Sequence, residues 1–281
     1  MQRVMLGLAV LSIWSLSTGH TLAQKGNDGP KVSLKKVVKM ALKAHGGREK
    51  LKTIQGFTMT LEGTVYKSPS ETSGYRNTFS MLANGNTRSV LRLKYGDKVT
   101  EGLAIINQEG MWMKVGPSPM QQLPKVYWKV EMGETLALWE GLLLRSLADG
   151  NAKLTSLGLV KVKGPVVALA RDCQGIKIER EGNPTVRVYI DNSRHQVVKM
   201  LFKKRILSKP QPPSAKGQKN SPKKAAFMTY ELFFSNFQAE QGVQIPRKIA
   251  AQKDGIFAGE FEVASVKFET EFTKNTFAAP K

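Results

Sequence analysis

The feature that most constrains this chain is an alternation of apolar and polar residues that begins at Gly56. The apolar set is Phe57, Met59, Leu61, Gly63 and Val65, and the polar set is Thr58, Thr60, Glu62, Thr64 and Tyr66. Successive side chains of a β-strand point to opposite faces of its sheet. The pattern therefore predicts a strand with one buried face and one solvated face.

Similar short runs recur along the chain, separated by turn sequences such as Ala83-Asn84-Gly85-Asn86. The further predicted strands are Arg76 to Ala83, Arg88 to Tyr95, Lys98 to Ile106, Gly110 to Val115, Lys153 to Val162, Val166 to Ala170, Gly175 to Arg180, Thr185 to Ile190, Val197 to Ile206, Phe227 to Phe237, Gln244 to Gln252 and Gly255 to Phe272. Short connections join antiparallel neighbours. We therefore expect a mainly antiparallel β fold of the α+β class.

Two of these strands carry additional information. Phe227 to Phe237 is apolar on both faces, which predicts a strand covered on both sides. In the last strand the apolar set changes face between Val263 and Val266. This change predicts a bulge or bend near Ala264-Ser265.

Three segments have the 3.6-residue period of helices. Ser33 can cap a helix that runs to Gly46-Gly47, and a short turn follows from Arg48 to Ile54. The third helix is predicted from Met132 to Leu147, and apolar residues cover nearly all of its circumference. Such a helix must be buried on most sides, as a core element or as a plug over a concave sheet.

The N-terminus has the pattern of a signal peptide. Arg3 precedes an apolar run, and Thr21-Leu22-Ala23 supplies the small or neutral residues of a cleavage site, so we expect cleavage after Ala23. An uncleaved anchor is the alternative. No cysteine lies near this point for lipid attachment. The expected product is an exported, soluble, periplasmic protein with one domain, residues 24–281.

The chain is strongly basic, with a formal net charge of +21. Such a charge attracts polyanions, including acidic lipid head groups and anionic wall polymers. The basic residues are spread through the strands, so a solvated basic surface is the simplest interpretation, and export makes nucleic acid an unexpected partner. Ser208 to Ala225 contains four prolines and five lysines without apolar periodicity, which predicts a disordered basic loop within a hairpin.

No residue pattern indicates a catalytic or metal centre. After removal of the signal peptide, His45 and His195 are the remaining histidines and Cys173 is the single cysteine. Their spacing does not match that of metal ligands. His45 ends a helix, where a structural role is the simpler interpretation. No nucleophile elbow, phosphate loop or dinucleotide motif occurs. We therefore expect no enzyme, no cofactor and no bound metal, although a site assembled from distant residues would leave no motif.

Several segments together resemble the LolA-like superfamily of exported bacterial proteins, which sort outer-membrane lipoproteins. They are Ala44-His45-Gly46-Gly47 with Leu51 and Ile54, the strand Phe57 to Gly63, Leu157 to Gly164, Val188 to Asp191 running into Gln196 to Lys199, Phe234 to Phe237 with Gly242 to Ile249, and the ending Phe277 to Pro280. The resemblance implies an incomplete antiparallel β-barrel wrapped around helices, with an apolar concavity that holds acyl chains in the carrier proteins. The length, charge and basic loop depart from the carriers, and no ligand residue is transferred.

Two functions remain open at this point. The first is a periplasmic binding or carrier protein for a hydrophobic or amphiphilic ligand, such as a lipid or lipoprotein acyl chain, with basic residues attracting its acidic head. The candidate lining residues are Phe57, Met59, Leu61, Leu136, Trp139, Leu143, Phe233 and Phe268. For each of these residues, a place in the ordinary hydrophobic core is the simpler interpretation.

The alternative is a non-catalytic cell-envelope structural or interaction protein that binds anionic polymers, an anionic membrane surface or a protein partner through its basic surface. The sequence does not indicate an oligomeric state.

Overall fold

The computed structural model describes residues 33–68, 70–165, 170–206, 226–269, 271–273 and 275–279. Three predicted features lie outside these residues: the signal peptide with its cleavage after Ala23, residues 166–169 of the strand Val166 to Ala170, and the loop Ser208 to Ala225. These features stay predictions.

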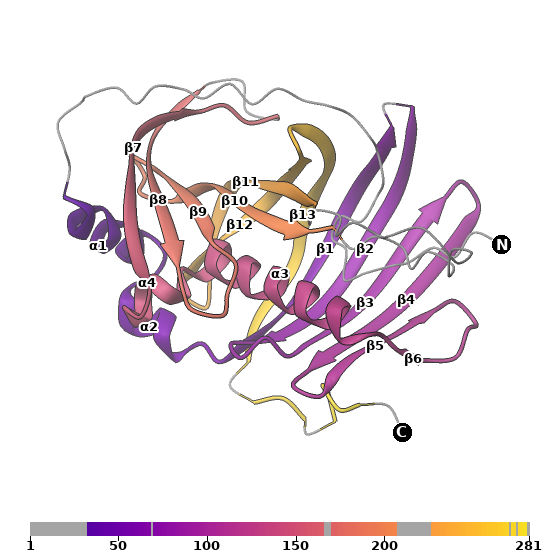
Figure 1. Cartoon of the computed structure of the whole chain (residues 1–281). Coiled ribbons are helices and arrows are strands. Elements are labelled where there is room, and N and C mark those ends of the chain that lie inside the picture. Colours follow the sequence, from indigo (N-terminus) through magenta and orange to yellow (C-terminus); the bar gives the residue numbers. More distant parts are fainter. Residues whose placement is uncertain are drawn as a thin grey trace, which may run out of the picture.

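The described strands form one 13-stranded antiparallel sheet (Figure 1). They are β1 Gly56–Ser68, β2 Glu71–Leu82, β3 Thr87–Tyr95, β4 Lys98–Asn107, β5 Gly110–Val115, β6 Gln121–Gln122, β7 Lys153–Val162, β8 Arg171–Glu179, β9 Val186–Asp191, β10 Val197–Arg205, β11 Phe227–Glu240, β12 Val243–Lys253 and β13 Ile256–Glu269. The spatial order is β6-β5-β4-β3-β2-β1-β13-β12-β11-β10-β9-β8-β7. Because β6 and β7 end this order without pairing to each other, the sheet is open. The predicted antiparallel fold and incomplete barrel are confirmed.

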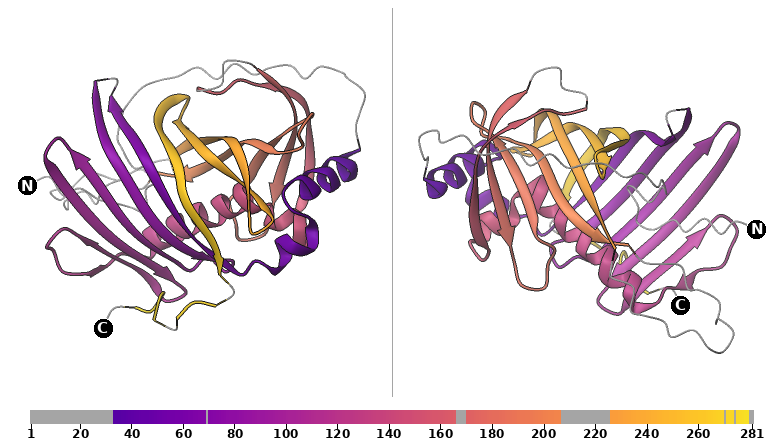
Figure 2. Two further views of the ribbon diagram at one scale, coloured as in Figure 1. Left: turned by 180° about the vertical axis from the view of Figure 1, so that it is seen from behind. Right: turned by 45° about the horizontal axis from the view of Figure 1, so that its top comes forward.

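The path of the chain explains the shape of the sheet. Strands β1 to β6 form one meander, and β7 to β13 form a second that starts at the far edge and returns until β13 pairs with β1. At this junction Gly63 faces Phe261, and a Cβ atom on Gly63 would lie only 2.1 Å from the carbonyl oxygen of Glu260. The two meanders curve around a long helix, seen from behind and from above in Figure 2.

The helices are α1 Leu34–Ala44, α2 Arg48–Thr53, α3 Lys125–Leu143 and α4 Arg145–Asp149. His45, at the C-terminal end of α1, is buried, and its Nε2 accepts a hydrogen bond from the backbone N–H of Val197 at 3.1 Å. Burial lowers the pKa of His45 to about 4. The neutral imidazole therefore attaches α1 to β10. His45 lies at the end of a helix as predicted, but its side chain is buried and not at the surface.

The third predicted helix, Met132 to Leu147, is wrong in extent. α3 begins directly after Pro124 and ends at Leu143, and a separate α4 follows. Leu144 has the left-handed conformation, with φ of 51°, so the helix cannot continue through it. The side chain of Glu140 then accepts a hydrogen bond from the backbone N–H of Ser146 at 2.8 Å, which satisfies a donor at the start of α4.

The two predictions for the late strands are largely confirmed. Thr60 pairs with Ser265 and Leu61 with Val263, so Ala264 is the extra residue of a bulge at the predicted place. In β11, Leu232, Phe233 and Phe234 are all buried, which shows cover on both faces at mid-strand. Phe227, at the start of the strand, is 58% exposed, so this cover does not reach the strand's end.

Candidate ligand site on the concave face

The concave face of the sheet carries the main apolar core. Alternate residues of each strand contribute to it, including Phe57, Met59 and Leu61 of β1. These three side chains are 1%, 1% and 3% exposed. The period-two pattern in the sequence therefore identified the buried face of β1 correctly.

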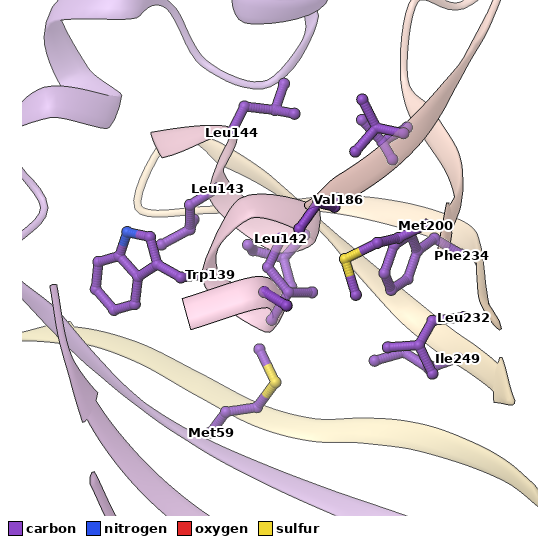
Figure 3. Packing of buried hydrophobic residues seen from close by; sticks show 14 of the residues in the cluster. Met59, Trp139, Leu142, Leu143, Leu144, Val186, Met200, Leu232, Phe234 and Ile249 are labelled. Atoms are coloured by element: carbon purple, nitrogen blue, oxygen red, sulfur yellow. The ribbon is translucent and has the colours of Figure 1, made fainter. Parts of the chain in front are cut away.

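Helix α3 fills this concavity, as Figure 1 shows for the ribbon. Trp139, Leu142 and Leu143 of its C-terminal half are at most 3% exposed, and the Trp139 ring lies 5.1 Å from the ring of Phe57 between centroids. Figure 3 shows Leu142 between Met59 on one side and Met200 on the other. The C-terminal half of α3 is thus the plug that the all-apolar circumference predicted.

The eight candidate lining residues fall into three groups. Phe57, Met59, Leu61, Trp139 and Leu143 are buried in the main core, and Phe268 packs against it partly buried. Leu136 borders a small pocket. Phe233 points to the opposite face of β11 from Leu232 and Phe234, and it joins a separate cluster with Cys173, Val198 and Ala250. Seven of the eight residues therefore lie on the concave side or along α3, and their role as ligand contacts stays a prediction.

Part of the concave face is only half covered. Leu93 of β3, Met113 and Val115 of β5 and Leu138 of α3 are partly buried residues that pack against the main core. They belong to the first meander and to the helix that crosses it. An apolar surface of this kind, next to a filled core, can accept a hydrophobic chain with little rearrangement.

A cluster of charged residues lies inside the same concavity, where the N-terminal half of α3 faces β10. The ammonium of Lys204 pairs with the carboxylates of Glu131, at 2.8 Å, and of Glu134. The three side chains are 10%, 7% and 5% exposed. Buried ion pairs are costly unless both partners are satisfied. This cluster therefore attaches α3 to β10 through directional contacts.

The ionisation of the cluster follows from its burial. Burial disfavours the charged form of Lys204, but the carboxylates of Glu134 and Glu131 outweigh this effect, so the pKa of Lys204 lies above its ordinary value. Burial raises the pKa of Glu131, against the opposing effect of Lys204. The sequence patterns did not predict that these three residues form a buried cluster. Their signals were two glutamates three positions apart on an apolar helix and a lysine that continues the buried alternation of Met200 and Phe202.

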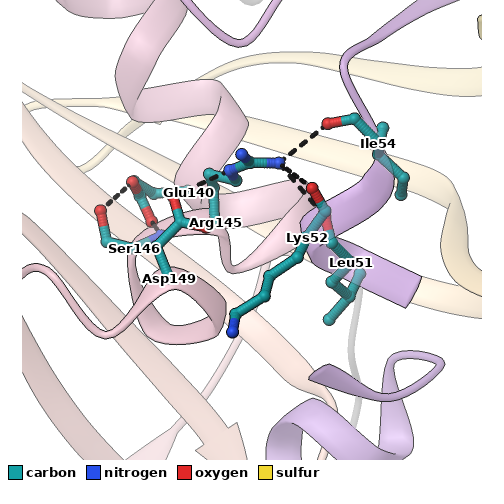
Figure 4. Close-up of polar contacts among 7 residues, drawn as sticks. All are labelled: Leu51, Lys52, Ile54, Glu140, Arg145, Ser146 and Asp149. Atoms are coloured by element: carbon teal, nitrogen blue, oxygen red, sulfur yellow. Dashed lines mark hydrogen bonds and ion pairs between the residues drawn. The ribbon is translucent and has the colours of Figure 1, made fainter. Parts of the chain in front are cut away.

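The junction of α3 and α4 is held by a second polar group. The Arg145 guanidinium donates hydrogen bonds to the carbonyl oxygens of Lys52 and Ile54, both at 2.9 Å, and to that of Leu51 at 3.4 Å (Figure 4). Its Nε donates to Asp149 at 2.9 Å. Arg145 thus satisfies carbonyls at the C-terminal end of α2 and fixes the position of α4.

A small pocket lies between α3 and the strands β8 and β9. It is lined by Leu136, Ala137, Glu140, Ser146, Ile178, Arg180, Asn183, Pro184 and Val186. Burial raises the pKa of Glu140. The enclosed space of this pocket is about that of one water molecule, so it does not hold an alkyl chain.

Three other observations bear on chemistry. Burial raises the pKa of the Cys173 thiol to about 12, so it is protonated and unreactive at neutral pH. No three His, Cys, Asp or Glu side chains of the described residues lie close enough together to hold a metal ion. Among the helices that the structure describes, none is both long enough and apolar enough to cross a membrane.

Comparison with known proteins identifies the fold. No family model and no curated protein matches the chain. A DUF1329 family protein from Desulfovibrio piger has a TM-score of 0.51 at 10% identity, covering 87% of this chain and 97% of its own. The LolA superfamily protein NE2245 from Nitrosomonas europaea has a TM-score of 0.50 at 10% identity, covering 89% and 99%. The resemblance to the LolA-like superfamily seen in the sequence is therefore confirmed at the level of the fold.

Proposed function

We propose that this protein is a non-catalytic periplasmic binding or carrier protein for a hydrophobic or amphiphilic ligand, such as a lipid or a lipoprotein acyl chain. The observation that carries this proposal is the half-covered apolar surface of Leu93, Met113, Val115 and Leu138 beside the plug helix α3. A fully closed core would offer no such surface. The fold shared with a LolA superfamily protein supports the same class of function by analogy alone.

Native mass spectrometry of the purified mature protein tests the proposal directly. We expect a lipid-sized adduct, and we expect delipidation to lower the thermal unfolding temperature, because a ligand that binds only the folded state stabilises it. Absence of any adduct, together with a melting temperature that does not respond to delipidation or to added lipid, would contradict the proposal.

A pair of variants on β5 locates the ligand. Met113→Glu places a charge on the concave face, whereas Lys114→Glu places the same residue at the neighbouring exposed position, on the other face of the strand. We expect Met113→Glu to abolish the adduct and Lys114→Glu to retain it. Equal retention by both variants, each folded by circular dichroism, would place the ligand elsewhere.

The alternative function, attachment to anionic envelope polymers or membrane surfaces, is favoured by the net charge of +21. It makes a different prediction in solution. Binding to anionic vesicles would then fall steeply with salt, because exposed charges are screened. Retention of a lipid adduct at high salt distinguishes the carrier from this alternative.

A further inference from the structure

Two lysines, on the strands β10 and β12 that flank β11, point into the concavity on either side of Tyr230. Lys253 of β12 pairs with Tyr230 of β11, which pairs with Phe202 of β10. Lys204 lies two residues beyond Phe202 and therefore on the same face. Its ion pairs with α3 confirm that this face is the concave one.

The two lysines differ in how their charges are satisfied. Lys204 has the carboxylates of Glu131 and Glu134. Lys253 is only 9% exposed, yet its side chain forms no hydrogen bond or ion pair with the described residues, and its ammonium lies 5.7 Å from the centroid of the Tyr230 ring. A largely buried ammonium without an anion beside it is costly.

The electrostatics of Lys253 agree with this geometry. Burial lowers the pKa of Lys253 to about 7; Glu134 opposes the effect, and Lys204 adds to it. Glu134 therefore favours the charged form of both lysines. An additional anion at this position would pair with Lys253 and restore its charged form.

We propose that Lys204 and Lys253 form a subsite for the anionic head group of an amphiphile, and that Glu131 and Glu134 of α3 occupy its Lys204 side in the absence of ligand. The proposal rests on the proposed function and specifies its ligand: an alkyl chain with a carboxylate or phosphate head. The acidic head pairs with the ammonium of Lys253 and takes the place of the glutamate carboxylates beside Lys204. The chain then extends toward the half-covered apolar surface of Leu93, Met113, Val115 and Leu138.

The arrangement implies selectivity for charge. An uncharged head leaves the ammonium of Lys253 unpaired, and a cationic head adds repulsion to it. The glutamates of α3 compete with an anionic head but not with an uncharged one. Removing their charge should therefore favour anionic ligands over uncharged ligands of the same chain length.

Isothermal titration calorimetry with monomeric amphiphiles of equal chain length tests this subsite. Dodecyl phosphate and dodecanoate carry the anionic heads, and dodecyl maltoside is the uncharged reference. We expect both anions to bind the wild type about tenfold more tightly than the maltoside, the contribution of one charge-assisted hydrogen bond. The two anions separate the phosphate source of the head from the carboxylate source, and binding of either supports the subsite.

Variants then assign the preference to residues. Lys253→Met should reduce the ratio of anionic to uncharged affinity about tenfold, and Glu134→Gln should increase it several-fold. Lys248→Met is the matched control: it removes the same charge from the same strand, but its side chain is 60% exposed and pairs with Glu262. We expect this variant to leave the ratio unchanged.

The possible outcomes separate two failures. If the wild type binds the maltoside and both anions equally, or if Lys253→Met and Lys248→Met change the ratio equally, the subsite is wrong while the carrier function stands. If no dodecyl compound binds at all, both proposals are wrong. A ratio of anionic to uncharged affinity that falls in Lys253→Met but not in Lys248→Met supports the subsite.

Discussion

The two halves of helix α3 lie in the same concavity but are held there by different forces. Trp139, Leu142 and Leu143 of the C-terminal half are buried against apolar residues from several strands. In the N-terminal half, Glu131 and Glu134 are the buried residues, whereas Val126 is 41% exposed. The C-terminal half is oriented by apolar packing. The N-terminal half turns its acidic side inward and adds a smaller apolar contact, in which the partly buried Tyr127, Trp128 and Met132 pack against Ala104, Ile106 and Met111 of β4 and β5.

This difference teaches how the helix can be both a core element and an exchangeable cover. Apolar packing is non-directional, and its loss leaves a cavity that nothing refills. An anion that displaces Glu131 and Glu134 keeps the ammonium of Lys204 paired, while the two released carboxylates must reach solvent or take up protons. The N-terminal half also has one neutral polar attachment, since the indole N–H of Trp128 donates to the carbonyl oxygen of Asn107 at 2.8 Å. We expect the C-terminal half to supply stability and the N-terminal half to respond to ligands.

The largest effect on stability should come from Trp139→Ala in the C-terminal half. Removing this buried ring deletes its contacts with Phe57 and leaves a cavity, which costs roughly 3–5 kcal/mol of unfolding free energy. Urea denaturation followed by circular dichroism measures the loss. Val126→Ala in the exposed part of the N-terminal half is the control and should change stability by less than about 0.5 kcal/mol. Equal losses of unfolding free energy in both variants would contradict the claim that the C-terminal half of α3 supplies most of its stability.

The next effect concerns the ion pairs of the N-terminal half. Lys204→Met leaves Glu131 and Glu134 buried without a cation, and we expect a loss of about 3 kcal/mol by the same measurement. If the cost comes from the stranded carboxylates, replacing all three residues together should restore stability. The triple variant Lys204→Met, Glu131→Leu, Glu134→Leu should lie within about 1 kcal/mol of the wild type. No recovery in the triple variant would mean that the charges themselves hold the helix.

The two halves also differ in how far the sequence predicted them. The alternation of Phe57, Met59 and Leu61 identified the sheet and its buried face, because a period of two has one structural interpretation. The apolar residues Leu136 to Leu147 indicated a plug because they cover nearly all of the circumference of a helix, which must then be buried on most sides. The cluster of Glu131, Glu134 and Lys204 could not be predicted, since charged residues on a helix are normally solvated and their burial depends on contacts between distant segments. Leu144 could not be identified as a break either, because leucine rarely adopts a positive φ.

The smallest effect, and the one that depends on pH, concerns Lys253, which faces Glu134 of α3, Lys204 of β10 and Tyr230 of β11. Its pKa in the folded protein is about 7, below the ordinary value of 10.5, so between these pH values the unfolded chain binds more protons and stability rises with pH. Below pH 7 the folded protein bears the whole cost of the buried charge. Lys253→Met removes that cost, and we expect it to stabilise the protein by roughly 1–3 kcal/mol at pH 6 and progressively less toward pH 10.

Lys248→Met, measured by urea denaturation at the same pH values, corrects for the change in net charge. A Lys253→Met variant that is less stable than this control at pH 6 would show that Lys253 already has an anionic partner in the free protein, and the head-group subsite would then have no unpaired charge to offer a ligand.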